Sequence, residues 1–213
     1  MLDYSLYLVT DRSLSRGRTT LDVVRQAVAG GVTCVQLREK HCSTREFINQ
    51  ARALQPLLKD QRIPLIINDR LDVALAVGAD GIHLGQQDMA LADARKIVGQ
   101  TMVIGISAES VADAIRAEQQ GADYIGVSPV FATPTKTDTA KPLGLEGIQK
   151  IRQAVAIPIV GIGGVNQRSA AAVLGAGADG IAVVSAIVSA DDPKQAAADL
   201  KKIITDRSVS LRP

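Results

Sequence analysis

The tripeptide Gly-Ala-Asp occurs three times in the chain, as Gly78-Ala79-Asp80, Gly121-Ala122-Asp123 and Gly177-Ala178-Asp179. Each copy follows a segment with helical apolar spacing and precedes a short apolar run. Earlier in the chain, Gly30-Gly31 likewise lies between a helical segment and an apolar run. A glycine just past a helix adopts the left-handed conformation that ends the helix. Intervals of 47, 43 and 56 residues between these glycines predict a repeated unit of two strands and two helices.

Short apolar runs and helical segments extend this alternation along the chain. The runs are rich in Val and Ile and nearly continuous, as in strands buried on both faces of a parallel sheet. They cover residues 6–9, 34–37, 64–67, 81–84, 103–106, 124–127, 158–162 and 180–184. Segments with helical spacing cover residues 21–29, 44–58, 90–98, 111–119, 147–155 and 194–204. Eight such units predict an α/β fold of the (β/α)8 TIM-barrel type, with a single domain over residues 1–204 and a frayed C-terminal tail over residues 205–213.

An open doubly wound sheet is the competing interpretation of the same alternation. Such a sheet has a switch point in its strand order and often an early GxGxxG turn that binds phosphate. The sequence contains no such motif. The number of repeats and the chain length favour the barrel.

Composition limits the classes of function. The 213 residues, 46% hydrophobic and 22% charged, suffice for one large core and exclude intrinsic disorder. A net charge of +2 and the absence of Trp argue against a nucleic-acid partner. No signal-peptide pattern or membrane-length apolar run is present, and Cys34 and Cys42 form neither a CxxC pair nor a disulfide framework. We therefore expect a cytoplasmic protein without membrane partners, and the sequence leaves a homo-oligomer open.

Two loops have the character of a phosphate site. In barrels the active site lies at the carboxyl ends of the strands, and the loops after strands seven and eight commonly hold phosphate through backbone N–H groups. Here these loops are Gly161-Ile162-Gly163-Gly164 and Val184-Ser185, and the Ser185 hydroxyl adds a donor. A plain tight turn at Gly163-Gly164 is the alternative, and the paired strand-eight loop favours phosphate.

Cations and carboxylates follow other strands. Arg38 and Lys40 follow strand two and Lys136 follows strand six, and although each alone is typical of a solvated surface, together they indicate a polyanion. Asp69 and Asp88 follow adjacent strands, which is a usual seat of Mg²⁺ near phosphates. Each also precedes a helical segment, so a role as helix N-cap is equally open.

Four further polar residues have weaker signals. Ser107 either caps the next helix, a role for which Ser110 competes, or touches a ligand. Asn68 is either a turn residue or a ligand-binding amide. His83 alternates with apolar neighbours, which favours a packed side chain, and His41 is expected on an exposed loop. We expect neither histidine to have an acid/base partner.

With these positions in place, the sequence closely resembles the thiamine-phosphate synthase family, also called thiamine-phosphate pyrophosphorylases. The resemblance covers nearly the whole chain, and its motifs are specific in their order and spacing. They are Tyr7-Leu8-Val9-Thr10-Asp11, Gln36-Leu37-Arg38-Glu39-Lys40, Ile67-Asn68-Asp69, the segment from Asp80 to Asp88, Thr133-Pro134-Thr135-Lys136 and Gly161-Ile162-Gly163-Gly164.

The resemblance implies a reaction between a hydroxymethylpyrimidine diphosphate and a hydroxyethylthiazole phosphate, giving thiamine phosphate and pyrophosphate. It implies a pyrimidine diphosphate site within Gln36, Leu37, Arg38, Glu39, Lys40, Asn68, Ser107 and Lys136. It implies one Mg²⁺ per subunit on Asp69 and Asp88, and a thiazole phosphate site within Thr133, Pro134, Thr135, Gly164, Val184 and Ser185.

The resemblance also implies a dissociative mechanism, in which pyrophosphate leaves before the thiazole nitrogen attacks. No protein nucleophile is needed, and the sequence shows no evident Ser/His or Cys/His pairing. The catalytic groups implied are Arg38, Lys40, Lys136 and Ser107, which with the metal stabilise charge on the leaving group.

Two departures and two rival functions accompany the resemblance. Many relatives have His where this chain has Glu109 and Gly where it has Ser128, which bears only on fine contacts, and the segment 137–142 is expected to close over substrate. One rival is a thiazole tautomerase, an isomerase on the same barrel that uses a histidine near the end of strand five. The other is a non-catalytic barrel that binds thiazole phosphate. Neither has a use for the cations and carboxylates.

Overall fold

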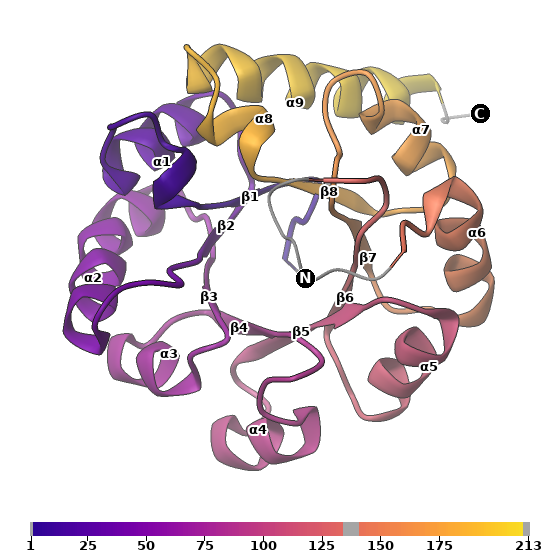
Figure 1. Ribbon diagram of the computed structural model, residues 1–213, viewed down its shortest axis with the longest axis horizontal. Helices are drawn as coiled ribbons and strands as arrows, with labels where there is room; N and C mark the ends of the chain where they lie inside the picture. Colours follow the sequence, from indigo (N-terminus) through magenta and orange to yellow (C-terminus); the bar gives the residue numbers. More distant parts are fainter. Residues whose placement is uncertain (1, 134–140, 211–213) are drawn as a thin grey trace.

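Eight short parallel strands form a closed barrel in the computed structural model, which describes residues 2–133 and 141–210 (Figure 1). The strands are β1 Leu6–Val9, β2 Cys34–Leu37, β3 Leu65–Asn68, β4 Gly81–Leu84, β5 Val103–Ala108, β6 Tyr124–Val127, β7 Ile159–Gly161 and β8 Gly180–Val183. They pair in chain order, and β8 pairs with β1 to close the ring. The predicted TIM barrel is confirmed, and the open sheet is excluded.

Helices surround the barrel on its outer side (Figure 1). They are η1 Arg12–Leu14, α1 Thr20–Ala29, α2 Thr44–Asp60, α3 Leu71–Val77, α4 Leu91–Val98, α5 Val111–Gln119, α6 Gly144–Ala154, α7 Ala170–Gly175, α8 Ser185–Val188 and α9 Pro193–Ser210. Helix α9 packs against α1 and α7, so it joins the end of the chain to its beginning. It also runs past residue 204, where the sequence analysis placed the end of the barrel.

Strand boundaries differ from expectation at two places that matter for function. Strand β3 includes Asn68, and β5 extends through Ser107 to Ala108. Both side chains are therefore set by strand alternation and not by a loop. Elsewhere the strands Leu6–Val9, Cys34–Leu37, Gly81–Leu84 and Tyr124–Val127 have the predicted bounds.

Alternation along each strand creates two apolar regions. In β1, Leu6 and Leu8 face the helices, whereas Tyr7 and Val9 face the barrel interior. The larger region lies between barrel and helices and contains most of the buried Leu, Ile, Val and Ala side chains. The interior cluster is small and consists of Tyr4, Tyr7, Val9, Cys34, Ile66, Tyr124, Val160 and Ala182. A barrel filled in this way is a packed core with its active face at one end.

The Gly-Ala-Asp repeat forms the end of the barrel at which the strands begin, here called the amino-terminal rim. Gly78, Gly121 and Gly177 have φ values of 63°, 86° and 109°, which confirms their predicted left-handed conformation. The following aspartates accept an N–H from the start of the neighbouring odd-numbered strand, within its first two residues. The pairs are Asp80 with Leu65 at 2.8 Å, Asp123 with Ile104 at 2.7 Å and Asp179 with Ile159 at 2.7 Å.

The fourth unit makes the same contact with a different residue. The Thr33 hydroxyl accepts the N–H of Leu6 at 3.0 Å. Arg95 and Arg152 then bind Asp123 and Asp179 and also donate to backbone carbonyls of the adjoining turns. The repeat thus satisfies strand-end donors that would otherwise be buried without partners.

None of the helices within residues 2–133 and 141–210 has both the length and the apolar character needed to cross a bilayer.

Candidate active site

A cavity of about 570 Å³ lies over the carboxyl ends of the strands, here called the carboxyl-terminal rim. Strands from all around the barrel contribute to it, as expected for this fold. It brings together many residues that the sequence analysis selected. These are Gln36, Arg38, Lys40, Asn68, Asp69, Asp88, Ser107, Thr133, Gly164, Val184 and Ser185.

Two selected side chains do not line the cavity. Leu37 is fully buried in the region between barrel and helices, because alternation along β2 turns Gln36 and Arg38 inward and Leu37 outward. Glu39 also lies outside the lining, and burial raises the pKa of its carboxyl. Pro134, Thr135 and Lys136 fall outside the residues that the structure describes, as does most of the segment 137–142 expected to close over substrate.

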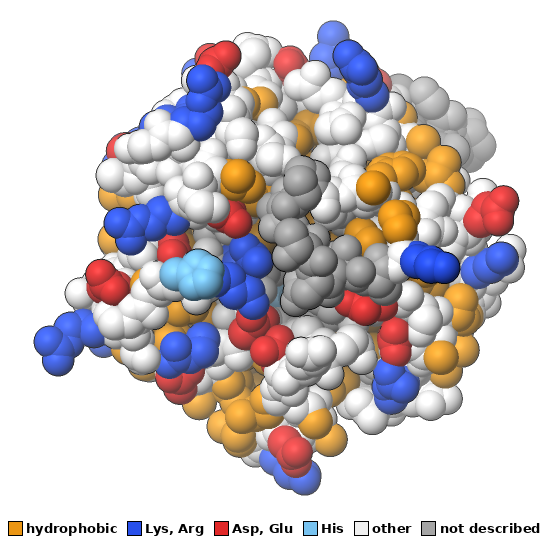
Figure 2. Space-filling view, viewed as in Figure 1, with side chains coloured by type: hydrophobic (Ala, Val, Ile, Leu, Met, Phe, Trp, Pro, Cys, Tyr) orange, Lys and Arg blue, Asp and Glu red, His pale blue; other side chains and the backbone are white. Residues whose placement is uncertain are grey.

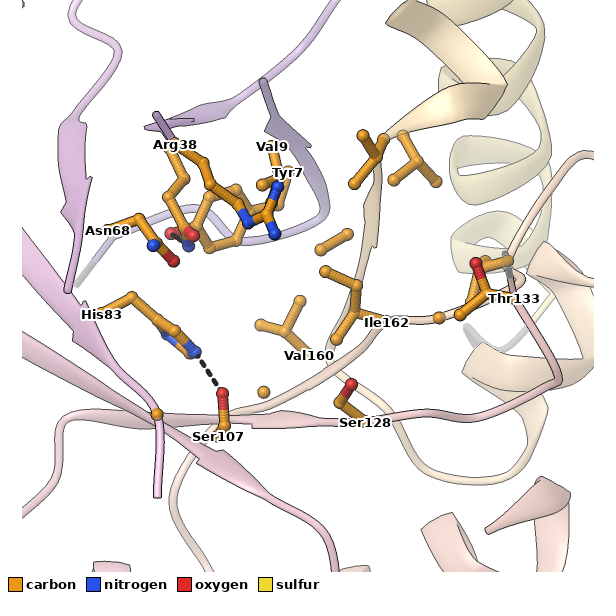
Figure 3. Close-up of a pocket in the computed structure, with 18 of the residues that line it drawn as sticks. Tyr7, Val9, Arg38, Asn68, His83, Ser107, Ser128, Thr133, Val160 and Ile162 are labelled. Carbon is orange, nitrogen blue, oxygen red and sulfur yellow. Dashed lines mark hydrogen bonds between the residues drawn. The ribbon is translucent and has the colours of Figure 1, made fainter. Parts of the chain in front are cut away.

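The cavity has a polar side and an apolar side (Figure 3). Arg38, Asn68, His83 and Ser107 project into it from β2 to β5 and the turn after β2. Val160 and Ile162 lie across from them, on β7 and the turn after β7, and Ala182, Val183 and Val184 also line the cavity. A ligand with a charged part and an apolar ring matches this division.

The cations at the rim are held by carboxylates. Arg38 is paired with Asp11 at 3.0 Å, and both side chains are largely buried. Lys40 donates to Asp69 at 2.6 Å. Figure 2, in the same view as Figure 1, shows Lys and Arg side chains next to Asp and Glu on this face. The pairing fixes both cations at the mouth of the cavity.

Asp69 and Asp88 lie together and share a hydrogen bond. Burial opposes ionisation of Asp69, but the hydrogen bonds from Lys40 and Asp88 hold its pKa below the ordinary value. For Asp88, burial and the hydrogen bond with Asp69 raise the pKa, although its carboxylate accepts the Gly85 N–H at 2.7 Å. Opposite shifts of this kind are expected for two neighbouring carboxyls, because the charge of the one that ionises first opposes ionisation of the other.

Neither aspartate caps a helix. The N-cap positions of α3 and α4 are Arg70 and Ala90, and neither helix has a side-chain cap there. The capping interpretation is therefore wrong for both Asp69 and Asp88. Asp69 also has a φ of +60°, which is uncommon for a residue other than glycine and turns its carboxylate toward Lys40.

The pair fits a magnesium ion but not a metal that needs a full protein cage. Within residues 2–133 and 141–210 no cluster of three His, Cys, Asp or Glu side chains is placed to hold a metal. Mg²⁺ accepts one or two carboxylates and completes its shell with water and substrate phosphates. Two adjacent carboxyls at the mouth of the cavity are a suitable donor set for such an ion.

The glycine loop lies on the side of the cavity opposite these carboxylates. Gly163 and Gly164 have φ values of 95° and 67°, and a Cβ at Gly164 would stand 2.8 Å from the carbonyl oxygen of Ala132. Only glycine fits this turn without strain. Ser185 begins helix α8 and lines the same cavity as Gly164. The loop therefore offers backbone groups at close range, as a phosphate site requires.

Ser107 and Asn68 both face the cavity. Ser110, and not Ser107, caps helix α5 by accepting the Asp113 N–H at 3.1 Å, so the capping alternative for Ser107 is wrong. Asn68 lies within β3 and is 8% exposed, so it is not a turn residue. His41 is exposed, as expected.

His83 contradicts the expectation of a packed side chain without partners. Its ring lines the cavity, with Nε2 3.0 Å from the Ser107 hydroxyl and Nδ1 3.0 Å from the Tyr124 hydroxyl (Figure 3). A Ser/His pair therefore exists, contrary to the sequence analysis. Tyr124 in turn bonds Tyr7 at 2.9 Å, and the Gln36 amide donates to Tyr7 at 3.0 Å.

Sequence reasoning missed His83, Tyr7 and Tyr124 as cavity residues. Each stands at an inward-facing position of its strand, one residue from an outward-facing apolar neighbour. Polar and aromatic residues at inward positions of three strands, β1, β4 and β6, were the available signal. These positions can be recognised as inward-facing only when the register of the barrel strands is known.

Comparisons with known proteins agree with this geometry. The family model described as thiamine monophosphate synthase matches residues 6–187. A thiamine-phosphate synthase of Chloroflexus aurantiacus is 54% identical over 205 residues, covering 96% of this chain and 94% of the relative. One of Albidiferax ferrireducens is 55% identical over 199 residues, covering 93% and 91%.

A solved structure shows the same likeness in three dimensions. The thiamine phosphate pyrophosphorylase of Pyrococcus furiosus superposes with a TM-score of 0.89 at 41% identity, covering 96% of each chain.

Proposed function

Because this chain belongs to the thiamine monophosphate synthase family, we propose that it joins 4-amino-2-methyl-5-(diphosphooxymethyl)pyrimidine to 4-methyl-5-(2-phosphooxyethyl)thiazole. The products are thiamine phosphate and pyrophosphate, and the enzyme is a transferase. One observation carries the choice of substrates. A single cavity has a cation and carboxylate cluster on β2 to β4 and a glycine loop on β7 and β8, across the barrel from each other.

The cluster suits the pyrimidine diphosphate. Arg38 and Lys40 supply charge for the diphosphate, and Gln36, Asn68 and Ser107 supply polar groups that also reach a heterocyclic ring. Lys136 belongs to this site on sequence grounds. Leu37 and Glu39 contribute no side chain to the cavity, so the proposal gives them no side-chain contact with substrate.

Asp69 and Asp88 would hold Mg²⁺ at this side of the cavity. When bound, the ion supplies positive charge that neutralises the diphosphate as it leaves. Lys40 already contacts Asp69, so its ammonium group lies where the same anion would arrive. Arg38 is kept in place by Asp11 and can donate to phosphate oxygens through its remaining N–H groups.

The other side of the cavity suits the thiazole phosphate. Val160, Ile162 and Val184 provide an apolar surface for the ring. Gly164, Ser185 and Thr133 supply donors for the phosphate, and Pro134 and Thr135 are assigned here from the sequence alone. The ring nitrogen of the thiazole then faces the polar side, where the pyrimidine lies.

The proposed reaction needs no covalent bond to the protein. The C–O bond between the pyrimidine methylene and the diphosphate breaks, and its electron pair stays on the diphosphate oxygen. The thiazole nitrogen then gives its lone pair to the methylene cation and forms the C–N bond of thiamine phosphate. Arg38, Lys40, Lys136 and Ser107 stabilise the leaving group, which is the charge that develops most. The two free thiols, Cys34 and Cys42, agree with a reducing compartment, and the proposal places the enzyme in the cytoplasm.

An isomerase acting on thiazole phosphate is the second candidate, because the structure brings His83 to Ser107 at the end of β5. Such an enzyme has no use for the cluster of Lys40, Asp69 and Asp88. A barrel that only binds thiazole phosphate has no use for it either.

Release of pyrophosphate tests the proposal against both. Purified protein receives both substrates with Mg²⁺, and each component is omitted in turn. Pyrophosphate that forms only when all three are present supports the synthase. Isomerisation of the thiazole phosphate, or binding without turnover, contradicts it.

A further inference from the structure

Five side chains from five strands form one line of hydrogen bonds across the floor of the cavity. They are Gln36 of β2, Tyr7 of β1, Tyr124 of β6, His83 of β4 and Ser107 of β5, and consecutive members lie 2.9 to 3.0 Å apart. Tyr7 and Tyr124 are fully buried. Strands that are far apart in sequence thus contribute to one polar unit inside an otherwise apolar cluster.

Which group donates in each of these hydrogen bonds, here called the direction of the line, follows from Gln36, its first member. The amide nitrogen of Gln36 only donates, so the Tyr7 oxygen accepts. The Tyr7 hydroxyl has a single proton, which goes to Tyr124, since the Cys34 thiol beside it is a weak acceptor. The Tyr124 proton then goes to Nδ1 of His83. Burial raises the pKa of both phenols well above the ordinary value, so both remain donors.

The same direction fixes the last two members. Nδ1 accepts from Tyr124, so a neutral His83 carries its proton on Nε2 and donates it to the Ser107 oxygen. Within residues 2–133 and 141–210, the only hydrogen bond of the Ser107 hydroxyl is the one to His83. Its proton is therefore available to a ligand in the cavity, which Ser107 lines.

The opposite direction of donation would give the arrangement of a nucleophilic serine. In a Ser/His nucleophile pair, Nε2 is unprotonated and takes the serine proton, while a carboxylate accepts from Nδ1–H. Here the group at Nδ1 is a phenol placed to donate, and not a carboxylate. The resemblance to a nucleophile pair is thus confined to the distance between Ser107 and His83.

We propose that this line of hydrogen bonds keeps the His83 proton on Nε2 and thereby makes Ser107 a donor to an acceptor atom of the pyrimidine diphosphate. Tyr124 and His83 act through Ser107 and are positioning residues. The role of the ligand rests on the proposed function, whereas the direction of the line does not.

The direction is measured on the free protein by ¹⁵N NMR of the histidine rings. The chain has two histidines, so His41→Ala leaves only His83. We expect the Nε2–H form in the wild type and a loss of that preference in Tyr124→Phe. A wild-type ring with its proton on Nδ1 would overturn the proposal, whatever the enzyme catalyses.

The action through Ser107 is measured by a double-mutant cycle with the two substrates. Ser107→Ala should lower kcat/KM by roughly 10- to 100-fold, and Tyr124→Phe should lower it by about 10-fold. The double variant should match Ser107→Ala alone, because the proposal has Tyr124 act on the ligand through Ser107. Losses that multiply would show that Tyr124 acts independently of Ser107 and would contradict the proposal.

Two further variants separate positioning from packing. Glutamine can accept from Tyr124 and donate to Ser107, so His83→Gln should keep more activity than His83→Leu. Equal losses in these two variants would contradict the proposal. Tyr4 packs against Tyr124 in a tilted arrangement, with ring centroids 4.6 Å apart, and is outside the line, so Tyr4→Phe should change kcat/KM less than about twofold. If the wild type releases no pyrophosphate, the proposed function fails, while the NMR result still decides the direction.

Discussion

The two rims of the barrel use the same kinds of charged residue in different ways. At the amino-terminal rim, Asp123 accepts the Ile104 N–H and binds Arg95, whose other donors reach the carbonyls of Met102 and Gly121. At the carboxyl-terminal rim, Asp69 and Asp88 bind Lys40 and each other beside an open cavity.

The difference lies in what the charges bind. The first set is saturated by backbone groups of the strand ends, so its energy contributes to the fold. In the second set, the carboxyls of Asp69 and Asp88 lie close together and Lys40 contacts Asp69. These groups face an open cavity, so they remain able to bind a metal ion and an anion. A substitution at one rim should therefore change stability, and a substitution at the other should change catalysis.

Replacing both cavity carboxylates should have the largest effect. Asp69→Asn with Asp88→Asn removes the charge that would hold Mg²⁺, and we expect pyrophosphate release to fall about a thousandfold or more. The melting temperature should change little, because neither aspartate caps a helix. Near-normal turnover in the double variant would show that the comparison between the rims is wrong.

Asp123→Ala tests the opposite rim. It leaves the Ile104 N–H and part of Arg95 without a partner, so the free energy of unfolding should fall by about 2–4 kcal/mol in urea titrations. The value of kcat/KM should stay the same at temperatures where the variant is folded. Asp123→Asn keeps an oxygen for Ile104 and should cost less. A change in kcat/KM without loss of stability would contradict the assignment of this rim to the fold.

Gly164→Ala should raise KM for the thiazole phosphate about tenfold. Its φ of 67° is unfavourable for alanine, and the added Cβ would contact Ala132 and Phe131 at the glycine loop. Gly78→Ala is the matched control, because Gly78 has a φ of 63° and no atom within 4 Å of a built Cβ. The control should lose stability only. Equal KM values in both variants would remove the glycine loop from the thiazole site.

Asp88→Asn alone should have the smallest effect, a gain in stability of less than about 1 kcal/mol at pH 7 without metal. The raised pKa of Asp88 means that its protonated form favours folding, and this contribution is lost as pH rises through the raised value. The gain should therefore disappear below the ordinary pKa of 3.8. Asp88 is exposed, so water keeps the effect small.

Asp69→Asn is the matched control, and we expect it to lower the stability of the fold where Asp88→Asn raises it. The pKa of Asp69 is lowered, so its ionised form stabilises the fold above the ordinary value, and this contribution is lost as pH falls. Thermal unfolding of the two variants over pH 3 to 8 compares them. Stability changes of the same sign in both variants would contradict the opposite pKa shifts of the two carboxyls.

Most of the fold was predictable from the sequence because each strand and helix has a local pattern. The repeated glycines have the positive φ values that were expected, and four strands have the predicted bounds. The bonds from Asp80, Asp123 and Asp179 to strand ends were not predictable, since they join residues that only barrel closure brings together.

The site was predictable where a residue follows a strand, and less so where it lies within one. Arg38, Lys40, Asp69 and Asp88 stand at strand ends, so their convergence follows from the fold alone. The side of the strand that His83 and Leu37 face depends on register. Sequence spacing predicted a packed His83, which lines the cavity, and the Leu37 side chain, selected through the resemblance, faces the helices.

Closure of the ring has a consequence for synthesis of the protein. Strand β1 is made before the other strands and pairs with β8, and Lys201 of α9 donates to Ser5 at 3.0 Å, so β1 finds its second neighbour only after β8 has been synthesised. Until then the nascent chain exposes one edge of β1 and the apolar surface that α9 will cover. The barrel therefore cannot close before β8 has been synthesised, and shielding of that edge by a chaperone is most useful in this interval.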